Sequence, residues 1–184
     1  EVIEKTLSLS KKSFQEWSQT SLNERKKIIL LFVENFLQNN EEIEEQLCRQ
    51  MGRPISQCSG EMRGFKERAL YMIEKSEEAL QNIISRKDNE FDNFIVKEPL
   101  GTIFIIAPWN YPYNTSVNSI VPSLLSGNCA ILKHSSQTPL CAEQLYKAAK
   151  SSGLPEGVFQ FLHLDHKSTS QIIGDNRIDH VLFT

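Results

Sequence analysis

The sequence predicts an α/β protein in which N-terminal helices precede a doubly wound parallel sheet. Charge divides the chain unevenly, because residues 1–98 hold 33 of the 43 lysine, arginine, aspartate and glutamate residues and residues 99–184 hold the other 10. In the second part, short apolar runs alternate with segments of helical character, which is typical of parallel strands covered by helices on both faces. The charged first part instead indicates exposed amphipathic helices.

The first part supplies the helices. Ser21 and Glu24 form a capping-box pattern, and apolar residues then recur at roughly helical spacing, namely Leu22, Ile28, Ile29, Phe32 and Phe36. A second helix is expected over Glu41–Met51, since a glycine and a proline follow it within three residues. A third fits Ser59 to about Ile84. The alternating segment Phe91–Val96 then predicts a strand with one face exposed.

The second part supplies the sheet. The expected strands are the apolar runs Ile103–Ala107, Cys129–Lys133, Val158–Leu162 and His180–Phe183. The expected helices between them are Thr115–Ser126, Pro139–Ser152 and Lys167–Ile173. In such a Rossmann-like sheet, ligands bind outside the carboxyl ends of the strands. Two polar segments fall at those ends, Pro108-Trp109-Asn110 and Lys133-His134-Ser135-Ser136.

Composition excludes several classes of protein. A formal net charge of -3 gives no footprint for nucleic acid or for an anionic membrane. No apolar run approaches the ~20 residues of a membrane span, and the N-terminus has no signal-peptide core. The four cysteines show no CxxC pairing, which predicts reduced thiols in the cytoplasm. Because the chain stops inside the apolar run Val181–Phe183, we expect a fragment.

Asn110 and Lys133 are the candidate site residues, and each has an ordinary alternative. A side-chain amide fixed at a strand end can donate to a developing oxyanion, whereas most asparagines in turns satisfy nearby backbone groups. Lys133 could reach a ribose hydroxyl or a phosphate, or point into solvent. Cys129 lies within an apolar strand, where cysteine is commonly core filling and not a nucleophile; Cys48, Cys58 and Cys141 are weaker candidates still.

Two further patterns argue against other kinds of site. His163 and His166 are three residues apart, but no cysteine or third histidine completes a ligand set, so no metal is expected. The eight glycines never take the GxGxxG spacing, so a nucleotide would not bind through the usual first-turn phosphate loop.

A series of motifs runs in order along nearly the whole chain. They are Met51-Gly52-Arg53-Pro54, Glu98-Pro99-Leu100-Gly101, Ala107-Pro108-Trp109-Asn110-Tyr111-Pro112, Pro122, Ser126-Gly127-Asn128, Lys133, Thr138-Pro139, Gly153-Leu154-Pro155, Gly157-Val158 and Phe183-Thr184. Together they resemble the NAD(P)-dependent aldehyde dehydrogenase superfamily. The pair Lys133-His134 and the stretch Leu164-Asp165-His166 resemble its succinate-semialdehyde dehydrogenase branch in particular.

The resemblance implies a division of the chain and a covalent mechanism. Residues 1–85 would form a helical segment packing on the cofactor domain, 86–98 a β segment of the oligomerisation region, and 99–184 the first part of the NAD(P)-binding domain, with the catalytic domain absent. In the family, a cysteine thiolate attacks the aldehyde, hydride passes to the cofactor and a glutamate-activated water hydrolyses the thioester. Both residues follow the family's Phe-Thr-Gly-Ser turn, so this chain alone is expected to be inactive.

The resemblance also assigns site residues. Asn110 matches the asparagine that helps to hold the thiohemiacetal oxyanion, and Lys133 matches the lysine that binds the adenosine ribose. The expected cofactor-binding residues are Ile106, Ala107, Pro108, Trp109, Asn110, Lys133, Ser135 and Ser136. The cofactor is expected to be NADP or NAD, because Ser136 stands where many members carry a ribose-binding glutamate. His163 and Asp165 stand where many members have glycines.

The function expected is therefore that of the N-terminal part of an NAD(P)-dependent aldehyde dehydrogenase. The complete protein would form a homodimer or homotetramer and oxidise an aldehyde, with succinate semialdehyde as the candidate, to its carboxylic acid. The alternative is a truncated, non-catalytic homologue that keeps the family's oligomerising surface as a binding module. The coding sequence after Thr184 separates the two.

Overall fold

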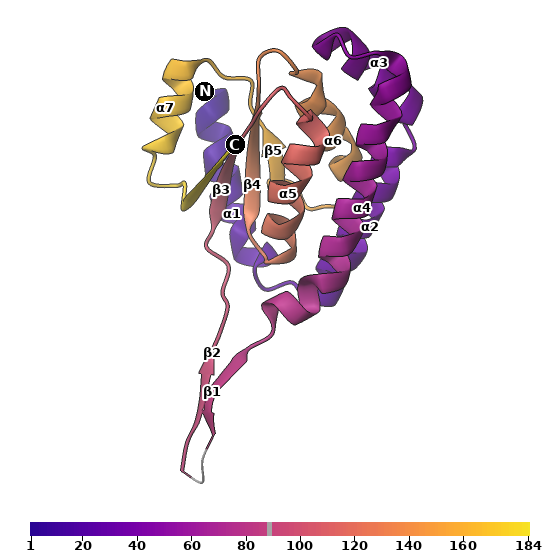
Figure 1. The fold of residues 1–184 in the computed structure, drawn as a ribbon. Helices are drawn as coiled ribbons and strands as arrows, with labels where there is room; N and C mark the ends of the chain where they lie inside the picture. The colour runs from indigo at the N-terminus through magenta and orange to yellow at the C-terminus, as the bar shows by residue number, and fades with distance from the viewer. Residues whose placement is uncertain (88–89) are drawn as a thin grey trace.

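A computed structural model describes residues 1–87 and 90–184 (Figure 1). In chain order the elements are α1 (Val2–Trp17), α2 (Leu22–Leu37), α3 (Asn40–Met51), α4 (Ile55–Leu80), β1 (Ile83–Lys87), β2 (Asp92–Ile95), β3 (Thr102–Ala107), α5 (Pro112–Leu125), β4 (Cys129–His134), α6 (Leu140–Ser151), β5 (Phe159–Phe161), α7 (His166–Ile173) and β6 (His180–Phe183).

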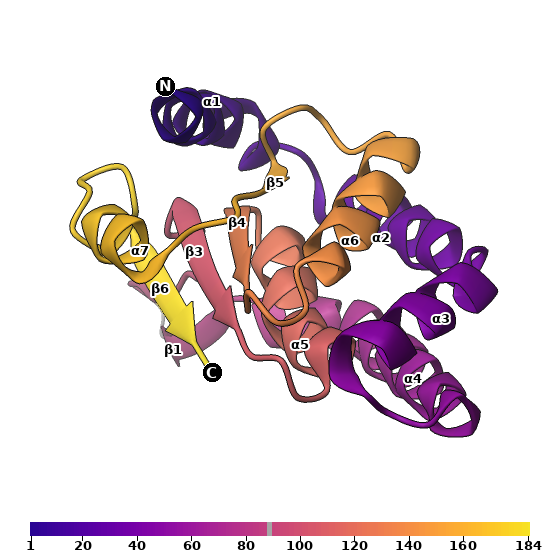
Figure 2. The same ribbon diagram turned by 90° about the horizontal axis from the view of Figure 1, so that it is seen from above.

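The centre of the molecule is a four-stranded sheet in the order β5-β4-β3-β6, and all of its strand pairs are parallel. Helices α5 and α6 cover one face and α1 and α7 cover the other (Figure 2). This confirms the predicted α/β class with a doubly wound sheet. The four predicted strands of this sheet are found within one residue of their expected ends.

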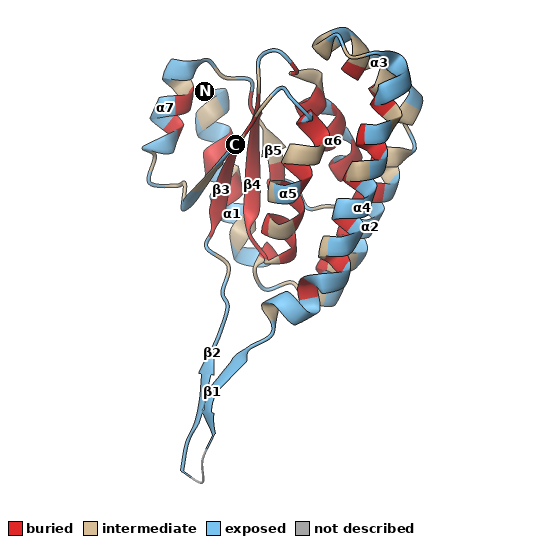
Figure 3. Cartoon of the chain, viewed as in Figure 1, coloured by how far each residue is buried: buried red, intermediate tan, exposed pale blue. Residues whose placement is uncertain are grey.

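Side-chain alternation along the strands builds two cores, and β3 and β4, which contribute to both, are almost entirely buried (Figure 3). Phe104 of β3 and Ile131 of β4 are register partners, and both pack with Leu7 of α1 and Ile172 of α7. The strand residues that alternate with these two along β3 and β4 belong to the larger core on the α5 and α6 side. A strand residue of one parity therefore faces α7, and its neighbour faces α5.

Helices α2, α3 and α4 form an outer layer against α5 and α6 (Figure 2). Phe36 of α2 packs between Phe65 of α4 and Tyr113 of α5, with ring centroids 4.3 Å and 5.0 Å away. The predicted cap of α2 is confirmed, because the Ser21 hydroxyl accepts a hydrogen bond from the Glu24 amide at 3.3 Å. Gly52, in the left-handed conformation with φ 73°, ends α3 as predicted.

The segment after α4 differs from the prediction. The helix expected over Ser59 to about Ile84 starts at Ile55 and ends at Leu80, and Ile83–Lys87 forms β1 instead. This strand pairs antiparallel with β2, and the hairpin projects away from the body (Figure 1). The strand expected over Phe91–Val96 is found as β2, but both strands of the hairpin are exposed along their whole length, so the expectation that only one of its faces is exposed is wrong. Alternation indicated a strand, but no other element of the described chain packs on either face.

Two further helices, α5 and α1, also differ from the prediction. Helix α5 begins at Pro112, three residues before the expected Thr115, because proline suits the first helical position, where its missing N–H is not needed. Helix α1 was not singled out in the sequence, although Leu7 and Trp17 on its inner side are fully buried.

Candidate functional site

The carboxyl ends of the strands carry the candidate site. The chain leaves β3 through α5 to reach β4 on one side, and it reaches β6 on the other side of β3 through α7. This reversal is a topological switch point, where ligands of open α/β sheets bind. A hollow of about 430 Å³ lies there, between the ends of β3, β4 and β6 and the side of α7. We refer to it as the switch-point hollow.

Most of the predicted cofactor-binding residues meet in this hollow. Six of the eight line it, namely Ile106, Ala107, Pro108, Lys133, Ser135 and Ser136. Trp109 and Asn110 are not among its lining residues and lie in the exposed turn between β3 and α5. The two predicted segments, some 25 residues apart in the sequence, thus lie side by side at the hollow. Their role in binding a cofactor stays a prediction.

Helix α7 contributes lining residues that the sequence analysis missed. His166, Thr169 and Ser170 line the hollow opposite the strand ends. The signal for their placement is Asp165, whose carboxylate accepts a hydrogen bond from the Ser168 amide at 2.7 Å and caps the helix. That bond holds the pKa of Asp165 below its ordinary value. An Asp-x-x-Ser cap starts the helix at His166.

Lys133 and His134 are neighbours on β4 that face opposite sides of the sheet. Lys133 shares its parity with Ile131 and lines the switch-point hollow. Only 9% of Lys133 is exposed, and no aspartate or glutamate is among the described residues that line the hollow. The hollow therefore holds a cation without an acidic partner, which favours an anionic ligand.

His134 faces α5 and fixes the loop that carries the two serines. Its Nδ1 accepts a hydrogen bond from the Ser135 amide at 3.0 Å, and the Thr138 hydroxyl lies 3.0 Å from the same atom. Its Nε2 lies 3.3 Å from the Ser116 hydroxyl and 3.4 Å from the Pro112 carbonyl. Burial lowers the pKa of His134 to about 4, so the ring is neutral at pH 7 and ties the start of α5 to the loop after β4.

The turn over Pro108–Tyr111 presents Asn110 to solvent. Tyr111 has φ 51°, and among the described residues it is the one non-glycine residue with a positive φ. It ends the turn at the start of α5. Asn110 is exposed, and none of the hydrogen bonds found in residues 1–87 and 90–184 uses its amide. The ordinary alternative, an asparagine that satisfies its own turn, therefore has no support in the geometry.

The chemistry of the hollow fits a nucleotide. Hydroxyl groups come from Ser135, Ser136, Thr169 and Ser170, and a positive charge comes from Lys133. Apolar side chains of the strands and of α7 complete the lining. A ribose and a phosphate need hydroxyl and cationic partners, and a base needs an apolar wall. The residues present supply all three.

The other candidate residues of the sequence are not part of this site. Cys129 and Cys141 are fully buried, and burial raises the pKa of each thiol to about 12. His163 pairs with Glu143 at 2.9 Å and does not line the hollow, whereas His166 does. Within the described residues, no three histidine, cysteine, aspartate or glutamate side chains are placed to hold a metal ion.

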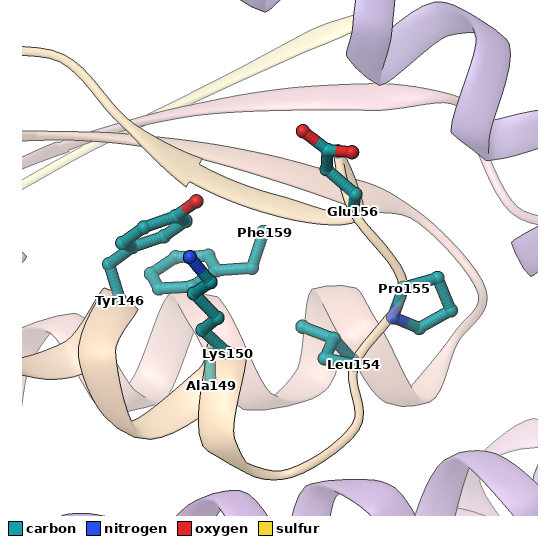
Figure 4. Close-up of a pocket in the computed structure, with 8 residues that line it drawn as sticks. Tyr146, Ala149, Lys150, Leu154, Pro155, Glu156 and Phe159 are labelled. Carbon is teal, nitrogen blue, oxygen red and sulfur yellow. The ribbon is translucent and has the colours of Figure 1, made fainter.

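A second hollow, of about 370 Å³, lies at the opposite edge of the sheet, and we call it the amino-edge hollow. It is bounded by the last turn of α6 and by the segment that enters β5, and Figure 4 shows Tyr146, Lys150 and Phe159 at its wall. Glu156 also lines it, so the negative charge of Glu156 offsets the positive charge of Lys150 in this hollow. Its position at the amino ends of the strands makes it the poorer candidate.

None of the described helices is both long and apolar enough to cross a membrane.

A doubly wound sheet with a cationic, hydroxyl-rich hollow at its switch point is the architecture of a nucleotide-binding α/β domain. Comparison with known proteins gives the family. The family model described as "Aldehyde dehydrogenase family" matches residues 1–184, and the chain therefore belongs to the aldehyde dehydrogenase family. The resemblance inferred from the motifs is confirmed.

Individual relatives agree with the family assignment. The chain is 31% identical over 182 residues to the succinate semialdehyde dehydrogenase (NAD(P)+) Sad of Escherichia coli, covering 99% of this chain and 39% of that protein. It is 29% identical over 172 residues to a probable succinate-semialdehyde dehydrogenase (NADP(+)) of Synechocystis, covering 94% and 38%. The chain thus spans about two fifths of the length of these relatives.

Solved structures show the same fold. An aldehyde dehydrogenase from Brucella melitensis biovar abortus matches with a TM-score of 0.93 and 21% identity, covering 99% of this chain and 38% of that one. A succinic semialdehyde dehydrogenase from Streptococcus pyogenes, in complex with NADP+, matches with a TM-score of 0.91 and 23% identity, covering 98% and 40%.

Proposed function

We propose that residues 1–184 are the N-terminal part of an NAD(P)-dependent aldehyde dehydrogenase that oxidises succinate semialdehyde, or an aldehyde of similar size and charge, to its carboxylic acid. Family membership supports the reaction class, and relatives that bear the succinate-semialdehyde name support the substrate. The observation that carries the proposal is the switch-point hollow, where Lys133 and Ser136 meet at the carboxyl edge of the sheet.

The cofactor is NAD or NADP, and the switch-point hollow holds its adenosine end. Lys133 and Ser136 bind the ribose and any phosphate on it, Ser135 adds a hydroxyl, and Ile106, Ala107 and Pro108 form the wall on the β3 side. When bound, the cofactor accepts the hydride of the aldehyde. Trp109 and Asn110 lie outside the hollow, in the turn that leads away from β3, where they meet the reacting end of the cofactor and the substrate.

Asn110 is the catalytic residue that this chain supplies. Its unused amide can donate to the oxyanion that forms when the substrate carbonyl is attacked. In the full-length protein, Asn110→Ala is expected to lower kcat by roughly 10²–10³, as for the loss of one oxyanion donor, with little change in cofactor affinity. The measurement is steady-state kinetics with succinate semialdehyde, together with calorimetric titration of NADP. A kcat within a few-fold of the wild type in a folded variant would leave Asn110 as a turn residue only.

The nucleophile and the general base lie outside residues 1–184. The burial of Cys58, Cys129 and Cys141 and the high pKa of the latter two thiols support this, because a catalytic cysteine must reach substrate as the thiolate. Cys48 is half-buried on α3 and is not among the residues that line the switch-point hollow. The isolated chain is accordingly inactive.

The hairpin of β1 and β2 belongs to the oligomerisation region of a homodimer or homotetramer. Its exposed apolar side chains support this proposal, since Ile83, Ile84, Phe94 and Ile95 are each about half exposed and a soluble monomer seldom presents such a ribbon. The domains expected from the sequence are residues 1–85, 86–98 and 99–184, but the hairpin begins at Ile83, so we place the first boundary before β1, which gives residues 1–82, 83–98 and 99–184. The four free cysteines support a cytoplasmic location.

The same hairpin is the observation that favours the second candidate, a non-catalytic module that only oligomerises. The two differ in one result. A full-length protein that binds NADP but leaves succinate semialdehyde and other aldehydes unoxidised would favour the module.

A further inference from the structure

A buried ion pair lies behind the turn that carries Asn110. Glu61 projects from α4 with a fully buried side chain, and its Oε2 pairs with Nη1 of Arg53, whose side chain is 13% exposed. Arg53 lies in the short connection between α3 and α4, directly after Gly52. Its guanidinium also stacks on the ring of Tyr111, 4.6 Å from the centroid. The pair thus joins the helical layer to the turn.

Glu61 also supplies the cap that α5 lacks. The first residue of α5 is Pro112, which has no N–H, and the preceding Tyr111 makes no capping hydrogen bond with its side chain. The next two amides, of Tyr113 and Asn114, both donate to Oε1 of Glu61, at 2.8 Å and 3.4 Å. The first backbone bond of the helix is that from Thr115 to Tyr111. The free donors at this helix end are therefore satisfied by one carboxylate from another helix.

Close packing of α4 on α5 makes this reach possible. Gly64 lies one turn beyond Glu61 on the same side of α4, and a Cβ there would lie 2.7 Å from Oδ1 of Asn114. A larger residue at this position would therefore crowd the Asn114 side chain on the first turn of α5. Because a buried carboxylate is costly unless it is paired and hydrogen-bonded, Glu61 holds Arg53 and the start of α5 in one arrangement.

We propose that Arg53 and Glu61 form a clamp that positions Asn110 for its role as oxyanion donor. The inference rests on the proposed function of Asn110. Tyr111, which follows it, is held in a left-handed conformation, with its ring under Arg53 and its successor helix capped by Glu61. Asn110 is thereby fixed at the exit of β3. Since Glu61 occupies both free amides of α5, the oxyanion depends on the Asn110 side chain and not on the helix end. Arg53 and Glu61 are positioning residues that touch no substrate.

The test compares Glu61→Gln with Glu45→Gln in the full-length protein. Glu45 pairs with Arg49 on α3, but both side chains are more than half exposed, so this control removes an Arg–Glu pair without touching the turn. At Glu61, an amide offers one acceptor where the carboxylate offers two, so a donor faces a donor whichever way it turns. Glu61→Gln is expected to lower kcat at least tenfold, with the Kd for NADP changed less than twofold. Glu45→Gln is expected to change neither.

The decisive measurement repeats Glu61→Gln in the Asn110→Ala background. If the clamp acts through Asn110, the substitution lowers kcat less than twofold there, because the side chain it positions is gone. An equal loss in both backgrounds would overturn the clamp and leave the role of Asn110 intact. If Asn110→Ala alone leaves kcat unchanged, the proposed function of Asn110 fails first, and the clamp fails with it.

A second variant keeps the test valid if Glu61→Gln folds poorly. Arg53→Lys keeps the charge but loses the planar stack on Tyr111, and is expected to show the same pattern with a smaller loss of kcat. Amide hydrogen exchange reports the cap without activity. Exchange at Tyr113 and Asn114 is expected to accelerate at least tenfold in the Glu61 variant and not in the Glu45 variant. Unchanged exchange would mean that Glu61 does not hold α5.

Discussion

Cofactor preference can be altered at one exposed residue of the switch-point hollow. Ser136 lies at the rim, near the buried Lys133, and is itself exposed. Serine offers a hydroxyl and no charge, so a 2′-phosphate on the ribose meets the cation of Lys133 without opposition. Ser136→Glu adds a carboxylate that can accept hydrogen bonds from the ribose hydroxyls of NAD but repels the phosphate of NADP.

The size of the effect follows from exposure. Two unit charges 4 Å apart repel by about 4 kcal/mol at an effective dielectric of 20 and by about 1 kcal/mol in water. Because Ser136 is exposed while Lys133 is buried, the value lies between these limits. Each ~1.4 kcal/mol is a factor of ten, so these limits correspond to about 5-fold and roughly 700-fold, and Ser136→Glu is expected to shift the ratio of kcat/KM values toward NAD by at least about tenfold.

The assay measures kcat/KM for both cofactors in the wild type and in the variant at one ionic strength. Gln137→Glu is the matched control, since it adds the same charge one residue along, outside the lining of the hollow, and is expected to shift the ratio less than threefold. A wild type that already rejects NADP a hundredfold would refute the reasoning. So would an equal shift in both variants, which would indicate a general charge effect.

Two further predictions concern stability and assembly. His134 has a pKa of about 4 in the folded protein against about 6.5 in the unfolded chain. Between these pH values the unfolded chain binds more protons than the folded protein. The free energy of unfolding is therefore expected to fall by on the order of 3 kcal/mol as the pH drops from 6.5 to 4. His134→Gln should flatten this part of the pH profile in urea unfolding, and an unchanged slope would contradict it. Ile84 and Phe94 are register partners in the hairpin, and the double variant Ile84→Asp with Phe94→Asp should lower the oligomeric mass measured by light scattering. The control Tyr71→Asp, at an exposed position of α4, should leave the mass unchanged. An unchanged mass in the double variant as well would mean that the hairpin is not part of the interface.

The fold was predictable where periodicity and burial agree. The runs around Phe104 and Ile131 are continuously apolar because both faces of the parallel sheet are covered. The hairpin was not predictable in this way. Ile83 and Ile84 extend the helical pattern of α4 by two apolar residues, and only their β-branched side chains favour a strand. Alternation in β2 suggested a buried face that the described chain does not provide.

The site was predictable in its strand-end residues and not in its supports. Lys133 and Pro108 could be placed because polar residues at the ends of buried strands meet at one edge. His166 could not, because the Asp165 cap shows where α7 begins but not how the helix crosses the sheet. The pairing of Glu61 with the start of α5, 52 residues away, leaves no local signal at all, because a glutamate in a charged helix resembles any exposed one.

The central claim, that the switch-point hollow binds the cofactor, is tested most directly by calorimetric titration of NADP into the full-length protein and its Lys133→Met variant. Methionine keeps the apolar stem but removes the charge. A hydrogen bond to a charged group contributes about 1.5–3 kcal/mol, so Kd is expected to rise by roughly 10- to 150-fold. Lys150→Met, at the amino-edge hollow, is the matched control and is expected to leave Kd unchanged. An unchanged Kd in Lys133→Met, or a Kd that rises only in Lys150→Met, would contradict the account.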